Sequence, residues 1–277
     1  MNVIGLGGAG CKIAKQFENF PQYNVFFIDT DNKNDEKNFI KVKEQKTHEE
    51  YELNYKQINT KKIKGEATVI FAGSGKISGT ILRLLEQLKN RKLNVLYIKP
   101  DMSTAPPEAI VRERVTFGVL QQYTRSNLIS NLYIVSNAAV EQVLDSVSIS
   151  SYWHDINTVI TSTYNMLNVF ANTEPVLNTL SNPGVTSKIA TVGVVGYKSL
   201  EEKLFYNLQK PRLKKYFFGI SEKTLNEEKD LLHKIRNYIA SRTEDKCTAC
   251  FAIYSTNYEQ DYVYTTHYAS LIQEEEK

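Results

Sequence analysis

The sequence predicts an α/β fold: a parallel, doubly wound sheet domain followed by a smaller α+β domain with a mixed sheet, joined through a core helix. Three observations lead to this prediction. Apolar runs alternate with helical stretches in the first half of the chain, the alternation becomes irregular in the second half, and 277 residues suffice for two domains. We expect the domains to span residues 1–148 and 149–277.

The composition argues against several functional classes, among them nucleic-acid-binding, membrane-bound and secreted proteins. The 34 Lys and Arg residues against 31 Asp and Glu give a net charge of +3, which is too even to predict direct binding to nucleic acid or to a membrane surface. Three cysteines cannot build a disulfide framework and suit a reducing compartment. The first residues lack the features of a signal peptide, and no apolar run approaches the ~20 residues that span a bilayer. We therefore expect a cytoplasmic protein.

In the first half, runs of apolar, β-branched and aromatic residues predict buried strands. Helical stretches between them, for example after residue 80, favour right-handed crossovers and a parallel sheet. Residues 32–66 are polar and weakly periodic, which predicts a loop with short elements. The expected strands span residues 2–6, 24–28, 67–71, 94–98 and 131–135.

In the second half the order of elements changes. A helical pattern runs from residue 150 to 180, and an Asn-Pro-Gly sequence at 182–184 follows it. Because strands and helices no longer alternate strictly, this half predicts an α+β domain. Further helices are expected at 199–209 and 225–241, and strands at 188–195, 215–219, 247–254 and 261–268.

Two glycine-rich turns follow expected strands, a position where free backbone amides can bind phosphate. The first, residues 5–10, has the G-x-G-x-x-G pattern, and Asp29 or Asp31 lies at about the distance expected for a ribose-binding acid. Alone, it would also suit a nicotinamide- or flavin-dependent oxidoreductase. The second, residues 73–79, is not a Walker A loop, because Ile70 and Ile77 stand where that motif requires Gly and Ser or Thr.

The order of these motifs resembles the tubulin/FtsZ family. Residues 73–79 (GSGKISG) are similar to its phosphate-binding G-G-G-T-G-T-G, with three glycines and the hydroxyl of Ser78 retained. Downstream, Lys99-Pro100 resembles the family's strand-ending Lys-Pro. The segments 108–112 (EAIVR), 134–137 (IVSN) and 153–160 (WHDINTVI) resemble its E-G-x-x-R, I-P-N and F-A-D-V-x-T-V-M motifs.

The resemblance implies a guanine-nucleotide-binding cytoskeletal protein that self-assembles head to tail into filaments. It implies that the first domain binds GTP or GDP and that the second is an activation-type domain. It does not decide whether Mg²⁺ accompanies the nucleotide, and we expect no metal site made by protein residues. The residues implied for sugar and base are Asp31, Glu108, Arg112 and Asn137. Those implied for phosphates are Gly7, Gly8, Gly10, Gly73, Ser74, Gly75, Ser78 and Gly79.

Departures from the family pattern predict slow GTP hydrolysis, if any. In the family's Asn-x-Asp-x-x-Asp loop the aligned residues are Ser150, Tyr152 and Asp155, so Asp155 is the one remaining catalytic candidate for polarising water. Ile77 in the phosphate turn and the short segment 137–150 favour an alternative. In that alternative the chain is a pseudo-GTPase that acts as a structural or adaptor protein without nucleotide.

Ordinary structural roles compete with these assignments. Asp155 suits a helix N-cap, Glu108 and Arg112 suit an exposed i,i+4 ion pair, and Asn137 suits a turn. The Lys-, Asn-, Ile- and Tyr-rich composition is typical of an AT-rich genome. It hints at a phage or mobile element, which would place the protein in the host cytoplasm. The sequence indicates no cargo or adaptor.

Overall fold

The computed structural model describes residues 1–32, 36–53, 58–103, 105–144 and 146–274. The chain divides into two compact units, the first spanning Met1–Thr161 and the second beginning at Ser162. This division falls inside the long helix α6 (Tyr152–Ala171), so that helix is shared between the two units. The domain boundary expected at residues 148 and 149 stays a prediction.

The first unit is built on a parallel sheet with the strand order β3-β2-β1-β4-β5-β6. All five strands expected from the sequence are present, and β3 is an additional short edge strand within the polar segment. The strands are β1 (Asn2–Leu6), β2 (Asn24–Asp29), β3 (Phe39–Lys41), β4 (Ala67–Ala72), β5 (Leu93–Lys99) and β6 (Asn131–Ser136).

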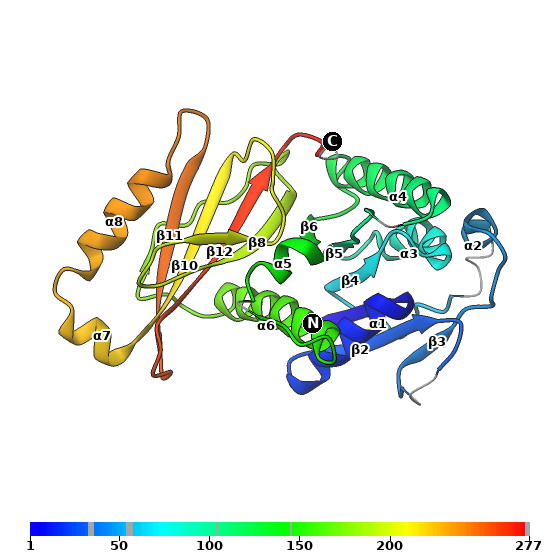
Figure 1. Cartoon of the computed structure of the whole chain (residues 1–277), viewed down its shortest axis with the longest axis horizontal. Coiled ribbons are helices and arrows are strands. Elements are labelled where there is room, and N and C mark those ends of the chain that lie inside the picture. Colours follow the sequence, from blue (N-terminus) through cyan, green and yellow to red (C-terminus); the bar gives the residue numbers. More distant parts are fainter. Residues whose placement is uncertain (33–35, 54–57, 104, 145, 275–277) are drawn as a thin grey trace. The chain divides into compact units, whose positions relative to one another are not determined.

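Helices cover both faces of this sheet (Figure 1). The step from β1 to β2 runs along the sheet in one direction, whereas the steps from β4 to β5 and from β5 to β6 run in the opposite direction. Right-handed crossovers therefore place α1 on one face and α3 and α4 on the opposite face. The helices of this unit are α1 (Gly7–Gln16), α2 (His48–Leu53), α3 (Ile81–Leu88), α4 (Pro107–Arg125) and α5 (Asn137–Glu141), with short 3₁₀ turns η1 (Phe17–Asn19) and η3 (Lys76–Thr80).

Burial on both faces explains the nearly continuous apolar runs of the central strands. Every residue of β1 is buried, as are all residues of β4 and β5 except the last of each strand. On α3, the buried stripe consists of Ile81, Leu84, Leu85 and Leu88, all fully buried, whereas Leu82 is half-buried. The connecting turns therefore begin at the carboxyl ends of well-packed, buried strands.

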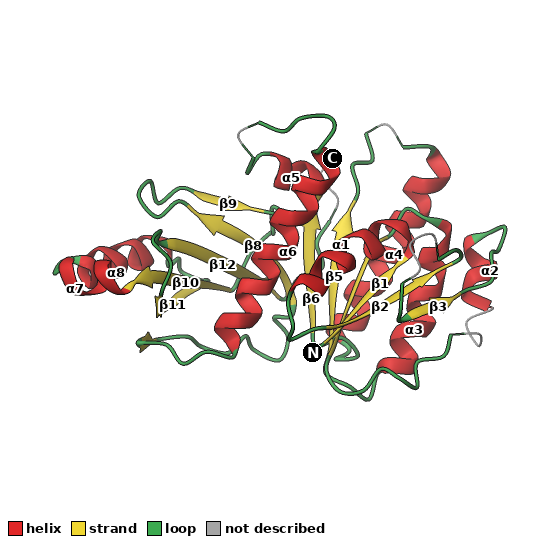
Figure 2. Cartoon of the chain, turned by 90° about the horizontal axis from the view of Figure 1, so that it is seen from below, coloured by secondary structure: helices red, strands yellow, loops and turns green. Residues whose placement is uncertain are grey.

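The second unit contains a mixed sheet with the order β8-β12-β10-β11-β7, and β9 pairs with β8 (Figure 2). Strands β10 and β11 are parallel, whereas the other pairs are antiparallel. The helix expected at 199–209 is wrong, because β9 lies there. The strands are β7 (Leu177–Asn178), β8 (Ile189–Val195), β9 (Glu202–Leu204), β10 (Leu213–Ser221), β11 (Thr248–Thr256) and β12 (Tyr262–Ala269).

Alternation along β10 builds two hydrophobic clusters in this unit. Tyr216 and Phe218 pack with α8 (Leu231–Arg242), which follows the short helix α7 (Glu222–Glu227). Phe217 points to the other face and stacks on Phe170 near the end of α6, with ring centroids 5.8 Å apart. The helical pattern expected to residue 180 ends at Ala171, and the short strand β7 follows it.

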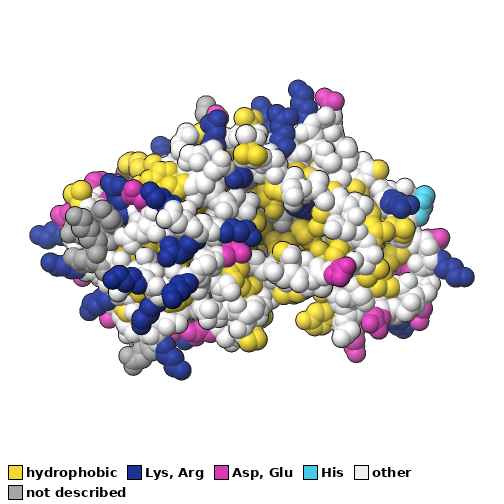
Figure 3. Space-filling view, turned by 180° about the vertical axis from the view of Figure 1, so that it is seen from behind, with side chains coloured by type: hydrophobic (Ala, Val, Ile, Leu, Met, Phe, Trp, Pro, Cys, Tyr) yellow, Lys and Arg dark blue, Asp and Glu magenta, His cyan; other side chains and the backbone are white. Residues whose placement is uncertain are grey.

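The surface carries charge of both signs. Figure 3 shows Lys and Arg side chains in many separate places on one face, interspersed with neutral and acidic side chains. This pattern is typical of an ordinary solvated surface. Within the described residues, no helix combines the length and the apolar character needed to cross a bilayer.

Candidate functional site

The candidate site lies where the strand order of the first unit reverses. Strand β1 is flanked by β2 and β4, and the chain leaves β1 in one direction and β4 in the other. In open α/β sheets, ligands bind outside the carboxyl ends of the strands at such a switch point. Both glycine turns found in the sequence begin there, one after β1 and the other after β4.

The first glycine turn begins α1. Gly7 has φ +69°, a conformation that favours glycine, and the apolar Leu6 at the N-cap leaves the first amides without a side-chain cap. Gly8 is exposed, and a Cβ built on it would meet no atom within 4 Å. Gly10 is different, because its Cβ would lie 2.1 Å from the carbonyl oxygen of Ile70. Gly10 thus serves the packing of α1 on β4, whereas Gly8 faces open space.

The second glycine turn is held by its own hydrogen bonds and by neighbouring elements. The hydroxyl of Ser78 lies 2.8 Å from the carbonyl oxygen of Gly73 and 2.7 Å from that of Gly75. A Cβ on Gly73 would meet the Tyr97 hydroxyl at 2.3 Å, and one on Gly79 would meet the carbonyl oxygen of His48 at 2.1 Å. Three of the predicted phosphate-binding residues therefore have structural roles that explain their identity without a ligand.

Arg112 ties α4 to this turn. Its Nε donates to the carbonyl oxygen of Ser74 at 3.0 Å, and its Nη1 lies 3.6 Å from a carboxylate oxygen of Glu108. The Arg112 side chain is largely buried, whereas that of Glu108 is 86% exposed. Arg112 is therefore a turn-positioning residue, and the Glu108 carboxylate remains open to solvent.

A buried polar group beneath the turn was not expected from the sequence. Glu113, on α4, accepts hydrogen bonds from the Tyr97 hydroxyl at 2.9 Å and from Lys99 Nζ at 3.0 Å. Lys99 also lies over the Phe117 ring, 4.5 Å from its centroid. The sequence predicts Lys99 only as the end of a strand, because no spacing rule links a strand end to the second turn of the next helix. The hydrogen bond to Glu113 therefore fixes the Tyr97 hydroxyl, which packs against Gly73.

His48 packs against the same turn from α2. Its Nε2 lies 3.5 Å from the Thr116 hydroxyl. Burial lowers the pKa of His48, and the nearby positive charge of Arg112 lowers it further. Its segment looked like loop in the sequence, because α2 has only six residues.

The remaining predicted residues occupy the same unit. Asp31 is exposed in the turn after β2, and Asn137 begins α5 directly after β6. Asp155 lies in the first turn of α6, where its carboxylate accepts a hydrogen bond of 2.6 Å from the Ser151 hydroxyl. The N-cap role expected for Asp155 is wrong, because α6 begins at Tyr152 and the Asp155 amide already donates to the Ser151 carbonyl oxygen at 2.9 Å inside the helix. A catalytic role for Asp155 stays a prediction.

An aromatic pair beside Asp155 is a further feature that the sequence did not single out. Tyr152 and Trp153 meet edge to face with centroids 5.0 Å apart, and Trp153 is 57% exposed. The Tyr152 hydroxyl donates to Glu141 of α5 at 2.9 Å. Burial, this hydrogen bond and the charges of Glu141 and Asp101 raise the pKa of Tyr152. Glu141 lies in α5, which directly follows β6, so the start of α6 lies near the carboxyl end of that strand.

The two turns fit a phosphate group in part. Gly8 is an exposed glycine with open space beside it, Gly75 is exposed with Ile77 Cγ2 4.0 Å from where its Cβ would be, and Lys76 is exposed next to Gly75. These features suit an anion, because uncapped amides and a lysine lie at the same edge of the sheet. Ile77 opposes the fit, since its Cγ2 lies only 2.7 Å from where a Cβ of Gly7 would be. Among the described residues, no cluster of His, Cys, Asp and Glu suits a metal ion.

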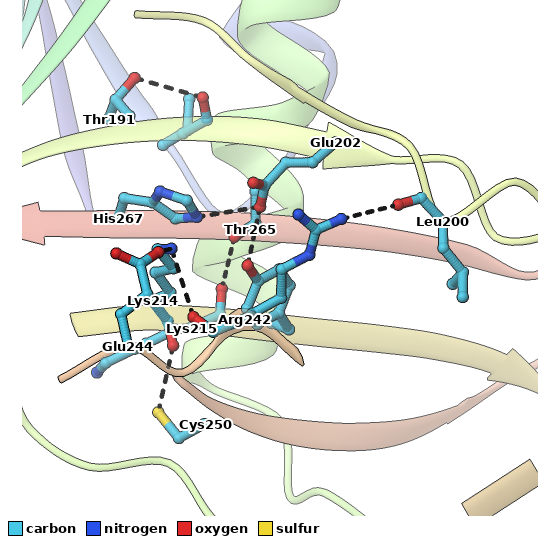
Figure 4. Close-up of polar contacts among 12 residues, drawn as sticks. Thr191, Leu200, Glu202, Lys214, Lys215, Arg242, Glu244, Cys250, Thr265 and His267 are labelled. Atoms are coloured by element: carbon cyan, nitrogen blue, oxygen red, sulfur yellow. Dashed lines mark hydrogen bonds and ion pairs between the residues drawn. The ribbon is translucent and has the colours of Figure 1, made fainter. Parts of the chain in front are cut away.

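A second titratable cluster lies within the second unit, and its contacts are internal (Figure 4). His267 Nε2 lies 3.0 Å from Glu202 Oε1, which also accepts a hydrogen bond from Tyr216 at 3.0 Å. Burial alone would raise the pKa of Glu202, but the contacts with His267 and Tyr216 and the charge of Arg242 lower it overall. The His267 side chain is 3% exposed. This cluster joins β9, β10 and β12 and is structural.

Comparison with known proteins identifies the architecture. No protein-family model matches the chain, and no curated protein matches it in sequence. Solved structures do match. One is FtsZ from M. jannaschii, with a TM-score of 0.70 and 11% identity over 97% of this chain and 87% of that chain.

Two further matches are protofilaments. TubZ from Bacillus thuringiensis serovar israelensis, in a GTPγS-form protofilament, has a TM-score of 0.71 and 14% identity, covering 98% of this chain and 87% of that chain. CetZ2 from Haloferax volcanii, in a GTPγS-bound protofilament, has a TM-score of 0.70 and 14% identity over 96% and 92% of the two chains. The chain therefore has the tubulin/FtsZ-like fold, as the sequence predicts.

Proposed function

We propose that this chain is a guanine-nucleotide-binding cytoskeletal protein that assembles head to tail into filaments and hydrolyses GTP slowly. The observation that carries this proposal is the position of the two glycine turns. Both follow neighbouring strands, β1 and β4, at the switch point of a sheet with the tubulin/FtsZ-like fold.

The phosphate groups of the nucleotide are assigned to the uncapped amides at the start of α1 and to the second turn. The exposed glycines Gly8 and Gly75 support this assignment, as does the exposed Lys76. Arg112 contributes by holding Ser74 in place. Glu108, Asp31 and Asn137 follow strands of the same sheet and are assigned to sugar and base contacts.

Self-assembly is supported by the similarity to TubZ and CetZ2, whose structures are protofilaments. Slow hydrolysis is proposed from the acidic loop. Ser150 and Tyr152 replace two polar family residues, and the Asp155 carboxylate is engaged by the Ser151 hydroxyl. A single carboxylate that is already hydrogen-bonded orients water less effectively than several open ones.

The test is pelleting at several protein concentrations with GTP, with GDP and without nucleotide, combined with measurement of phosphate release. We expect pelleting that requires GTP, and slow phosphate release that rises above a critical concentration. The Asp155→Ala variant should pellet with GTP but release less phosphate. If wild-type protein neither binds GTP nor pellets, the proposal is wrong and the fold serves a role without nucleotide. An unchanged phosphate-release rate in Asp155→Ala would remove that residue from the reaction.

A further inference from the structure

The side chain of Ile77 lies between the two glycine turns. Its Cγ2 would lie 2.7 Å from a Cβ on Gly7 and 4.0 Å from a Cβ on Gly75, so the side chain faces both turns. Gly7 is buried and Ile77 is half-buried, whereas Gly8 and Gly75 are exposed. Part of the space between the turns is therefore filled by an apolar group of the chain itself.

The backbone that carries Ile77 is fixed. Ser78, the next residue, is hydrogen-bonded to the carbonyls of Gly73 and Gly75. Gly79 packs directly on the backbone of His48. The turn cannot shift as a whole without losing the packing of Gly79 on His48 and the hydrogen bond from Arg112 to the Ser74 carbonyl. A β-branched side chain has few accessible χ1 rotamers, so Ile77 cannot move away from Gly7 without a conformational cost.

We propose that Ile77 sets the affinity of the nucleotide site by covering Gly7, so that phosphate binding requires Ile77 to rotate away from the first glycine turn. This inference rests on the proposed function, because it assigns the phosphates to the space between the two turns. The nucleotide affinity of the natural chain is then lowered by the cost of this rotation. Lys76 lies beside Ile77 and offers the phosphate a cation once the space is open.

The experiment compares two substitutions at this position. Ile77→Ala removes Cγ2, the atom that contacts Gly7, whereas Ile77→Val keeps both Cγ atoms and removes only Cδ1. The probe is GDP with a fluorescent N-methylanthraniloyl group, titrated with each protein and followed by anisotropy. Thermal melting of each variant with and without unlabelled GDP gives a second readout. Val115→Ala, at an exposed position of α4, is the control for loss of an aliphatic side chain elsewhere.

We expect Ile77→Ala to bind the probe about tenfold more tightly than wild type, since the rotation forfeits part of the burial of one isoleucine. Ile77→Val and Val115→Ala should stay within about twofold of wild type. Probe binding by wild type with equal or weaker binding by Ile77→Ala would overturn the inference and leave the proposed function standing. Binding by Ile77→Ala alone would support the inference and make the natural chain a closed site. If neither protein binds, both the inference and the proposed function are wrong.

Discussion

Two regions of the molecule differ in whether their polar groups are paired. The glycine turns of the first unit, residues 5–10 and 73–79 (the glycine edge), leave groups exposed. The group of Glu202, His267 and Tyr216 in the second unit (the Glu202 cluster) pairs its polar atoms with one another. At the glycine edge, Gly8 faces open space, and Gly75 and Lys76 are exposed. In the second unit, the Glu202 carboxylate meets both His267 and Tyr216, and Lys214 reaches Glu244 at 2.6 Å. Groups that contact one another stabilise the fold, whereas groups left open are free to bind a ligand.

The glycine edge itself contains both kinds of position, and two substitutions separate them. Gly10→Ala should destabilise the protein by about 3 kcal/mol, because the new methyl group would collide with the backbone of β4 at Ile70. Gly8→Ala should leave stability unchanged or slightly raised, because its methyl group meets nothing and alanine favours a helix. Thermal and denaturant unfolding measure both effects.

The same two variants should also differ in nucleotide binding. Gly8→Ala should weaken binding of labelled GTP, because a methyl group holds a phosphate away from the backbone amides. A folded Gly8→Ala protein with wild-type affinity would show that the first turn does not touch the ligand.

The Glu202 cluster should respond to mutation in stability alone. Glu202→Ala leaves His267 and Tyr216 without their shared acceptor, and we expect a loss of about 2 kcal/mol. Glu201→Ala is the matched control, because Glu201 is the exposed neighbouring acid. Denaturant unfolding at pH 7 measures the difference. Reduced nucleotide affinity in Glu202→Ala, with the fold intact, would contradict the structural role.

The contribution of Glu202 to stability should also depend on pH. The pKa of Glu202 is lower in the folded protein than in the unfolded chain, so its stabilisation is fully present above the unfolded carboxyl pKa, about 4.3. It is lost as pH falls through the folded value. The stability difference between wild type and Glu202→Ala should therefore shrink between pH 7 and pH 3. A difference that grows on acidification would reverse the sign of this argument.

Cys11 provides the smallest expected effect, on reactivity alone. It lies on α1, where nearness to a helix N-terminus would favour a reactive thiolate. Burial dominates and, with the charge of Asp29, raises the pKa of Cys11 to about 12. About one thiol in ten thousand is then ionised at pH 8. We expect iodoacetamide to leave Cys11 unmodified in the native protein and to modify it after unfolding, as measured by mass spectrometry.

Much of the fold could be predicted because its signals are local. The runs at β1, β4 and β5 are apolar on both faces, and each is bounded by a turn, so their positions follow from burial alone. The region around β9 could not be predicted, because its three residues, Glu202–Leu204, contain two charged side chains. This segment forms a strand because it pairs with β8, and such pairing is a tertiary effect.

The candidate site was predicted at the level of turns but not of contacts. The sequence identifies two glycine turns, and the parallel sheet brings them to one edge. It does not show which glycines serve packing, because Gly10 and Gly79 are explained by neighbours from β4 and α2 that are distant in sequence. The role of Glu113 beneath the turn likewise depends on how α4 lies over β5.

Binding of nucleotide at the glycine edge of the first unit can be measured by hydrogen–deuterium exchange of the full chain, with and without GTP and Mg²⁺. We expect slower amide exchange at residues 7–10 and 74–79 on adding GTP, and unchanged exchange in β9 and β12 around Glu202 and His267. Unchanged exchange at both glycine turns under saturating GTP, or protection confined to the second unit, would contradict the account.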